Sequence, residues 1–448
     1  MRPSRSSSLG AVLVTLVVAV TTLLFGLTTV ANTAGAAGTV TVSNFTGTGV
    51  SGPEGIAAGP DGALWFTNFG GDSIGRITTS GAVTNFTGTG IKGSRFIAVG
   101  SDGALWFTNS DNNSIGRITT TGTVTNFTGT GVSSPEGIAA GPDGALWFAN
   151  EGNNSIGRIT TGGTITSFVE PTVRNAVGMT VGSDGALWFT NAGSGTIGRI
   201  TTGGAVTNFG DASTSHGGTQ GITAGPDGAL WFTNLANNTI GRITTAGVIT
   251  HYAIPGSNND PLGIVAGADG ALWFTNVDNN SIGRITTAGV VTKYSDPTIS
   301  IPIDIAAGSD GALWFTNEGN NSIGRITVPQ PMVVPGTASI AEGNSGTTNL
   351  LVPVTLSIPS TQIVTAQWRT VFVPGAPGNE ADPATDYIPA SGTVTFAPGQ
   401  TSANVTVQIK GDTVVEPDEY FVVQFGNPTN ATMGGFWGLG FGGILNDD

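Results

Sequence analysis

Gly59-Pro60-Asp61-Gly62-Ala63-Leu64-Trp65-Phe66-Thr67-Asn68 recurs six more times along the chain, almost unchanged. The tryptophan of the segment returns at Trp106, Trp147, Trp188, Trp231, Trp273 and Trp314. Successive tryptophans are separated by 41 to 43 residues. A fixed period of this length indicates a repeat architecture, in which each unit is one small structural module.

Each repeat contains four short segments with the composition of β-strands. In the first repeat these are residues 55–59, the segment 63–68, Ser-Ile-Gly-Arg-Ile-Thr at 73–78, and the alternating run 82–86. Four strands in about 42 residues is the size of one β-propeller blade. The seven tryptophans therefore predict an all-β protein with a seven-bladed β-propeller.

The two ends of the repeat array complement each other. Residues 39–49 match the fourth segment of a later repeat at 123–131, but no first three strands precede them. The last repeat, 303–327, has three strands and lacks the fourth. Pairing the spare strand with the incomplete repeat would close the ring and remove two exposed sheet edges.

The chain divides into four predicted parts. Residues 1–36 read as an export signal, with Arg2 and Arg5, an apolar run over 9–30 and a small-residue cleavage site at 34–36. The propeller is predicted over 38–328, a proline-containing linker over 329–335, and a second domain over 336–448. We expect a secreted or cell-surface protein, with membrane contact only if the signal segment stays uncleaved.

Composition excludes several functional classes. The net charge of −14 argues against nucleic-acid binding, because few cations are available to neutralise phosphates. The chain has no cysteine, so disulfides and thiolate sites are excluded. Seven of its fifteen basic residues are the repeat arginines, one per blade, which we interpret as ion-paired side chains packed between blades. We expect a monomer.

The second domain loses the period and changes composition. Residues 332–448 hold ten Asp and Glu residues against only Arg369 and Lys410. Short alternating runs at 350–356, 392–396, 403–409 and 420–425 read as strands with turns between them. This pattern predicts an Ig-like β-sandwich.

One face of the propeller should be variable and the other uniform. The Pro-Asp-Gly and Thr-Thr-x-Gly turns share one face and are nearly identical in every blade, as turn chemistry requires. The residues that precede the inner strands lie on the other face and differ: Glu54, Arg95, Glu136, Val177, Gln220, Leu262 and Ile303.

A charged half facing an apolar half suits an amphiphilic small molecule, a peptide or a surface glycan. We predict a ligand-binding mouth formed by Glu54, Arg95, Glu136, Gln220 and the loop residue Glu151. The alternative is that these are ordinary solvated rim residues. The asparagine that ends each repeated segment, such as Asn68, is present in all blades and is predicted to tie turns together.

The chain has two histidines, His216 and His251. His216 lies in a long loop on the variable face and is the one candidate for an imidazole base there. His251 replaces Asn85 or Lys293 of other blades in an outer strand, where we expect it to face solvent.

The repeated unit, with Ser-Ile-Gly-Arg-Ile-Thr after it, resembles the virginiamycin B lyase (streptogramin lyase) family over residues 39–328. The resemblance implies Mg²⁺-dependent carbon–oxygen lyase chemistry that linearises cyclic depsipeptides, with a His/Glu arrangement on one mouth. Family repeats often read Pro-His-Gly-Ile and Trp-Phe-Thr-Glu, whereas this chain never has His at the first position and has Asn throughout at the second. A lyase would have to use His216 as base, with Glu54, Glu136 or Glu151 holding the metal.

The second domain is similar to a Calx-β domain. The matching residues are 339–346, 384–387, 395–401, 411–419 and 444–448. Calcium-binding members gather carboxylates from these segments, which is the donor type that Ca²⁺ prefers. The resemblance implies these Ca²⁺ ligands: Glu342, Asp386, Asp412, Glu416, Glu419, Asp447 and Asp448. The alternative is that they are solvated turn residues of a module that has lost its metal.

Together these observations favour an exported binding or adhesion-type protein with a propeller mouth and a calcium-stabilised sandwich. The main alternative is the depsipeptide lyase, and a structural spacer in a surface layer is a third reading. The ligand is not identified by the sequence.

Overall fold

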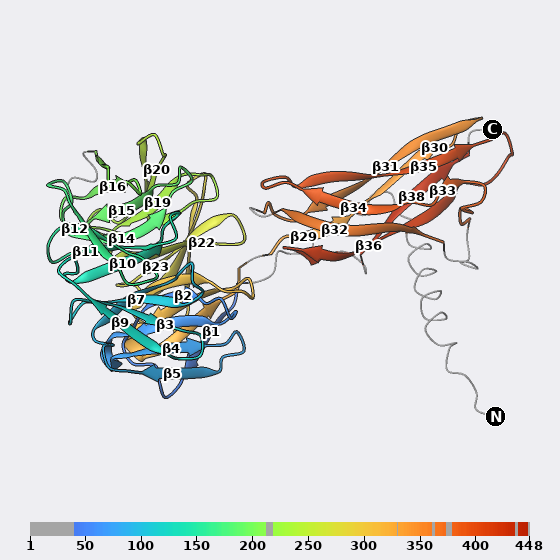
Figure 1. The fold of residues 1–448 in the computed structure, drawn as a ribbon. Helices are drawn as coiled ribbons and strands as arrows, with labels where there is room; N and C mark the ends of the chain where they lie inside the picture. Colours follow the sequence, from blue (N-terminus) through green and yellow to red (C-terminus); the bar gives the residue numbers. More distant parts are fainter. Residues whose placement is uncertain are drawn as a thin grey trace, which may run out of the picture. The chain divides into compact units, whose positions relative to one another are not determined.

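The structure, a computed structural model, describes residues 40–211, 218–328, 330–360, 363–372, 379–434 and 438–446. The predicted signal segment 1–36, His216, Asp447 and Asp448 lie outside these residues. The contacts divide the described chain into two compact units, Val40–Val328 and the residues from 330 onward. Both units are built from β-sheets, as predicted (Figure 1). Among the described residues, no helix has the length and apolar character needed to cross a membrane.

The first unit consists of seven four-stranded antiparallel sheets. The inner strands are β2 (Pro53–Ala58), β6 (Ser94–Val99), β10 (Pro135–Ala140), β14 (Ala176–Val181), β18 (Thr219–Ala224), β22 (Pro261–Ala266) and β26 (Pro302–Ala307). The second strands are β3 (Leu64–Asn68), β7 (Leu105–Asn109), β11 (Leu146–Asn150), β15 (Leu187–Asn191), β19 (Leu230–Asn234), β23 (Ala271–Asn276) and β27 (Leu313–Asn317).

The third strands are β4 (Ser73–Ile77), β8 (Ser114–Ile118), β12 (Ser155–Ile159), β16 (Thr196–Ile200), β20 (Thr239–Ile243), β24 (Ser281–Thr286) and β28 (Ser322–Ile326). The outer strands are β5 (Val83–Thr87), β9 (Val124–Thr128), β13 (Ile165–Val169), β17 (Val206–Phe209), β21 (Ile249–Ala253), β25 (Val291–Ser295) and β1 (Val42–Thr46). Two short 3₁₀ turns, η1 (Phe69–Gly71) and η2 (Glu318–Asn320), follow β3 and β27.

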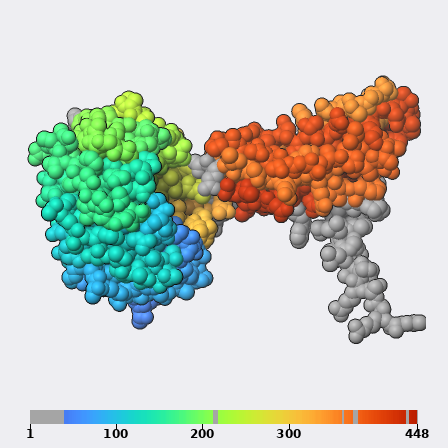
Figure 2. Space-filling model, viewed as in Figure 1, coloured from blue at the N-terminus to red at the C-terminus, as the bar shows by residue number. Residues whose placement is uncertain are grey.

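The ring closes as the sequence predicts. Strand β1 pairs antiparallel with β28, with Val42 opposite Ile326 and Thr46 opposite Ser322. The last sheet therefore combines the first strand of the propeller with the last three. Neighbouring inner strands pack against one another around the ring, including β26 against β2, and the propeller forms one compact body (Figure 2).

A tryptophan, an aspartate and an arginine stabilise each blade. In the first blade Trp65 Nε1 donates to Asp61 Oδ1 at 3.0 Å, and Arg76 Nε donates to Asp61 Oδ2 at 2.7 Å. The Arg76 guanidinium lies 6.0 Å from the centre of the fully buried Trp65 ring. The same ion pair recurs in the other six blades. The repeat arginines are thus ion-paired, as predicted, but within one blade rather than between blades, because Asp61 lies in the turn before β3 and Arg76 lies on the neighbouring strand β4.

The repeat asparagines are structural, as predicted. Asn68 is fully buried, accepts the N–H of Ser51 at 3.0 Å and donates to the carbonyl of Gly49 at 2.8 Å. These bonds fix the segment that enters the inner strand. The uniform face is likewise built from turns that require glycine, such as Gly62 with φ 76° and Gly81 with φ 93°.

The second unit is a sandwich of two five-stranded sheets, in the orders β33-β35-β31-β29-β37 and β30-β38-β36-β32-β34. Its strands are β29 (Met332–Pro335), β30 (Thr337–Ala341), β31 (Gly346–Leu356), β32 (Val364–Val371), β33 (Tyr387–Ile388), β34 (Ser391–Phe396), β35 (Ser402–Gly411), β36 (Glu419–Thr429), β37 (Thr432–Met433) and β38 (Leu439–Leu445). Alternate residues of the long strands, such as Val352 and Val407, are fully buried between the sheets. The sandwich prediction is confirmed.

The predicted linker 329–335 is too long. Residues 332–335 form β29, which pairs with β31 and places Val333 opposite Leu356. Val333 is fully buried, so burial of this apolar segment recruits it into the sandwich.

Candidate functional site

A cavity of about 490 Å³ lies at the centre of the variable face of the propeller. All seven predicted positions before the inner strands line it: Glu54, Arg95, Glu136, Val177, Gln220, Leu262 and Ile303. The cavity also contacts Asp304, Glu318 and a collar of apolar residues formed by Ile97, Ile138, Met179, Ile222 and Ile264. We refer to this cavity as the mouth.

The repeat threonines hold the mouth residues in position. Thr67 Oγ1 accepts the N–H of Gly55 at 2.9 Å and donates to the carbonyl of Arg95 in the next blade at 2.6 Å. Thr316 donates in the same way to the carbonyl of Glu54, at 2.7 Å, across the closure of the ring. Each such bond fixes the backbone of a mouth residue against the preceding blade, so the side chains start from a rigid ring.

Glycine follows the mouth position in five blades because neighbouring inner strands approach closely there. A Cβ on Gly137 would lie 2.2 Å from the carbonyl oxygen of Val177. The exceptions are Phe96 and Asp304, and both line the mouth. Their departure from glycine was a usable sequence signal that our predictions did not include.

The charged half of the mouth is organised around Arg95. Its Nη1 lies 3.3 Å from Glu54 Oε2, and its Nε lies 3.5 Å from Glu136 Oε1. The guanidinium also stacks over Phe69 of η1, 4.6 Å from the ring centre. One cation is therefore shared between two carboxylates and an aromatic ring.

Both glutamates are buried enough to change their acidity. The Glu54 and Glu136 side chains are only 14% and 10% exposed. Burial raises the pKa of Glu54 to about 7, with Arg95 opposing the rise and Glu318 and Asp111 adding to it. Burial likewise raises the pKa of Glu136 to about 7, where Glu151 and Glu54 add repulsion. Both groups therefore titrate near neutral pH.

Asp304 is a further carboxylate of the mouth. Its Oδ2 accepts the N–H of Ile56 in the first blade at 3.0 Å, and its Oδ1 accepts the N–H of Ile305 at 2.9 Å. Burial raises the pKa of Asp304 to about 6 despite these two bonds.

The other predicted residues of this face are placed differently. Glu151 does not line the mouth, although its charge acts on Glu136. His216 lies outside the described residues, so its predicted place on the variable face stays a prediction. His251 does not face solvent as expected. Its side chain is 15% exposed, because Nε2 lies 3.1 Å from Asp211 Oδ2 and the ring packs edge-on against Phe232.

The sandwich brings the described members of the predicted calcium set together. Asp386, Glu416 and Glu419 each offer one carboxylate oxygen, and these oxygens lie within 4.8 Å of one another. Glu342 and Asp412 are close enough to raise the pKa values of Glu419 and Glu416, respectively. The remaining two predicted ligands, Asp447 and Asp448, lie outside the described residues.

The carboxylate cluster has the chemistry of a hard-cation site. Burial, a shared hydrogen bond with Asp386 and the charges of Asp386, Glu416 and Glu342 raise the pKa of Glu419 to about 8. Without a cation the cluster must therefore retain a proton near neutral pH. Three converging carboxylates at this spacing fit the oxygen ligands of Ca²⁺.

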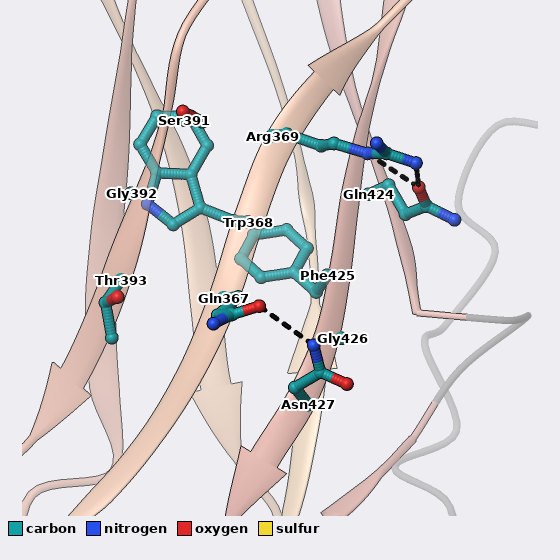
Figure 3. Close-up of a pocket in the computed structure, with 10 residues that line it drawn as sticks. All are labelled: Gln367, Trp368, Arg369, Ser391, Gly392, Thr393, Gln424, Phe425, Gly426 and Asn427. Atoms are coloured by element: carbon teal, nitrogen blue, oxygen red, sulfur yellow. Dashed lines mark hydrogen bonds between the residues drawn. The ribbon is translucent and has the colours of Figure 1, made fainter.

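A second groove, of about 530 Å³, lies on the sandwich (Figure 3). Its long polar side chains are paired with one another: Asn427 donates to Gln367 at 2.8 Å, and Arg369 donates to Gln424 at 2.8 Å and 3.1 Å. The Trp368 indole lies beside Ser391 and Gly392. Because these polar groups already satisfy each other, we assign no ligand to this groove.

Comparisons with known proteins agree with the geometry. The model of the virginiamycin B lyase family matches residues 30–177 and 169–336, and that of the Calx-beta domain matches 362–438. A streptogramin B lyase structure is 35% identical, with a TM-score of 0.61, and covers 64% of this chain and 97% of its own. Virginiamycin B lyase from Staphylococcus aureus is 37% identical, with a TM-score of 0.60, and covers 65% of this chain and 99% of its own.

A further Staphylococcus aureus structure, also 37% identical with a TM-score of 0.61, covers 65% of this chain and 100% of its own. It is described as a catalytically inactive histidine-to-alanine variant of virginiamycin B lyase with quinupristin. No curated protein sequence matches the chain.

Proposed function

The chain belongs to the virginiamycin B lyase family, and from this premise we propose that it is an exported ligand-binding protein rather than a lyase. In this proposal the propeller mouth binds an amphiphilic small molecule or peptide. The Calx-β sandwich, stiffened by Ca²⁺, serves as the second module of an adhesion-type protein at the cell exterior.

The observation that carries the proposal is the composition of the mouth. Its described lining contains carboxylates, one arginine and aliphatic residues, but no imidazole. The relative that is described as catalytically inactive differs from its parent by loss of one histidine. Here the described histidine, His251, lies in outer strand β21 and is paired with Asp211. A cavity whose described lining has no imidazole base suits binding without turnover.

Calcium would be held in the sandwich by Asp386, Glu416 and Glu419, with Glu342 and Asp412 beside them. Bound Ca²⁺ supplies no reaction chemistry here. It would neutralise converging carboxylates and would link the segment before β33, the segment before β36 and the first residue of β36. Extracellular calcium modules bind with dissociation constants of about 10⁻⁴ to 10⁻³ M, which suits a protein exported by its predicted signal segment.

A lyase is the second candidate, because one specific observation favours it. Glu54 and Glu136 have pKa values of about 7, which is the range expected of a general acid or base. In that version His216 would act as base and the glutamates, with Glu151, would hold Mg²⁺.

Incubation of the protein with quinupristin and Mg²⁺ separates the two functions. Elimination opens the ring without changing the mass, so chromatographic retention and remaining antibiotic activity are the readouts. The binding proposal expects no ring opening. Ring opening that disappears in His216→Ala would refute it in favour of the lyase.

A further inference from the structure

We propose that the mouth selects a cationic amphiphile, with a protonated amine held by Glu136 beside the Arg95–Glu54 pair and an aliphatic body lying on Val177, Leu262 and Ile303. This inference rests on the proposed ligand-binding function and names the class of ligand. It is carried by the charge of the cavity, by the burial of Glu136 beside a cation that it shares with Glu54, and by the apolar remainder of the lining.

The mouth has an excess of negative charge. Glu54, Glu136, Asp304 and Glu318 line it against a single cation, Arg95. Asp111 and Glu151 lie close enough to act on Glu54 and Glu136. Lys92, three residues before Arg95, is engaged in an ion pair with Asp72. The field in the cavity therefore attracts cations and repels anions.

Glu136 is mostly buried and is paired with Arg95. Its residue is 8% exposed, and the nearest cationic atom is Arg95 Nε, at 3.5 Å. Arg95 Nε is buried without a hydrogen-bond partner, so its contact with Glu136 is an ion pair and not a hydrogen bond. A mostly buried carboxylate that makes only a long ion-pair contact is stabilised by additional hydrogen-bond donors. An alkylammonium ion supplies three donors and the charge.

Arg95 is not available to an anionic ligand. Its Nη1 bonds both oxygens of Glu54, at 3.3 Å and 3.4 Å, and its face covers Phe69. The guanidinium instead lies between two glutamates and contacts both, Glu54 from the first blade and Glu136 from the third. An ammonium ion in the mouth would donate hydrogen bonds to Glu136 and would leave the Arg95–Glu54 contact in place.

The apolar part of the mouth lining fits the aliphatic body of the proposed ligand. Val177, Leu262 and Ile303 occupy the ring positions of the fourth, sixth and seventh blades, and an apolar collar lies next to them. Burying the methylene groups of an alkyl chain on such a surface favours binding. A small hydrated cation would leave this surface uncovered, whereas an alkylamine covers both halves.

The acidity of the glutamates sets a pH dependence. An ammonium ion stabilises the ionised forms of Glu54 and Glu136, whose pKa values burial raises to about 7. The groups that face them are Arg95, Glu318, Asp111 and Glu151. Binding of an amine should therefore strengthen as the pH rises from about 6 to about 8, where both glutamates become ionised.

The test is a calorimetric titration of the full chain with three probes of equal length: n-octylammonium, octanoate and n-octanol. We expect n-octylammonium to bind about tenfold or more tightly than octanoate, with affinity rising between about pH 6 and about pH 8. Glu136→Gln should weaken n-octylammonium about fivefold or more, because it removes the charge and keeps the shape. Glu170→Gln, an exposed carboxylate outside the mouth, is the matched control and should change nothing.

Octanoate binding as tightly as n-octylammonium, or n-octylammonium binding that Glu136→Gln leaves unchanged, would overturn the inference. Absence of n-octylammonium binding would overturn it too. Binding of octanol or octanoate that Leu262→Asp abolishes would then show that the mouth still binds ligands without preferring cations. The proposed binding function is tested separately, because ring opening of quinupristin by the protein would refute that function.

Discussion

Asp304 in the last blade accepts the backbone N–H of Ile56 in the first blade, at 3.0 Å. This bond joins the two inner strands, β26 and β2, that meet where the ring closes. The outer strand β1 closes the ring at its periphery, and Asp304 does so beside the mouth. A residue that departs from the repeat therefore stabilises the seam and adds charge to the cavity.

Asp304→Ala should destabilise the propeller by about 1–3 kcal/mol, because it leaves the N–H groups of Ile56 and Ile305 without this acceptor. Urea unfolding followed by tryptophan fluorescence measures the change, since seven of the nine tryptophans are in the blade repeats. The midpoint should fall while the slope stays constant. Glu170→Ala, in an exposed loop, should leave the midpoint in place. Equal midpoints for both variants would show that the seam bond contributes nothing.

Ala149→Thr should stabilise the propeller. Six blades carry threonine at this position, and in five of them its hydroxyl donates to the next blade. The fully buried Ala149 lacks the hydroxyl, so the carbonyl of Val177 receives no such bond. Restoring it should add about 0.5–1.5 kcal/mol.

The same urea titration measures this gain. Ala149→Val, which adds a similar volume without the hydroxyl, is the matched control and should not raise the midpoint. A gain shared by both variants would assign the effect to packing instead of the hydrogen bond.

The sequence predicts the scaffold well because the same strand and turn residues recur in every repeat. The period fixes the blade count, Trp65 and its copies fix the core, and the spare N-terminal strand, β1, completes the last blade. Strand pairing across a ring of seven equivalent units leaves few alternatives. The sandwich follows from the alternation of β31, β35 and β36, whose inward residues are apolar.

The site is less predictable because it depends on differences between copies. Alignment of the repeats finds Glu54, Arg95 and Glu136, and the structure places all three around one cavity. It does not reveal that one guanidinium serves both glutamates, or that Asp304 turns toward the neighbouring blade. The environment of His251 was likewise not predictable from its place in the repeat. An outer-strand position predicts exposure, but Asp211 and Phe232 cover the ring.

Without calcium, the stability of the sandwich should fall as the pH rises toward about 8. Glu419 has a folded-state pKa raised from 4.5 to about 8, so between these values the folded chain binds more protons than the unfolded chain. Stability is then full below the unfolded pKa and is lost as the pH rises through the folded pKa. Differential scanning calorimetry of the full chain in a chelator measures it. Glu419→Gln should flatten the pH dependence of one transition and leave the other unchanged, whereas a slope that survives Glu419→Gln would assign it to other groups.

Calcium binding should release protons near neutral pH. A cation among Asp386, Glu416 and Glu419 must displace the proton that the raised pKa of Glu419 retains. Titration calorimetry in two buffers of different ionisation enthalpy should therefore give different apparent heats, with affinity increasing toward about pH 8. Glu416→Gln should weaken binding about tenfold or more by removing one of three converging charges. Asp296→Asn, in an exposed turn of the propeller, should leave affinity and proton release unchanged. Identical heats in both buffers would mean that the ion binds elsewhere, because a site at Glu419 cannot fill without expelling its proton.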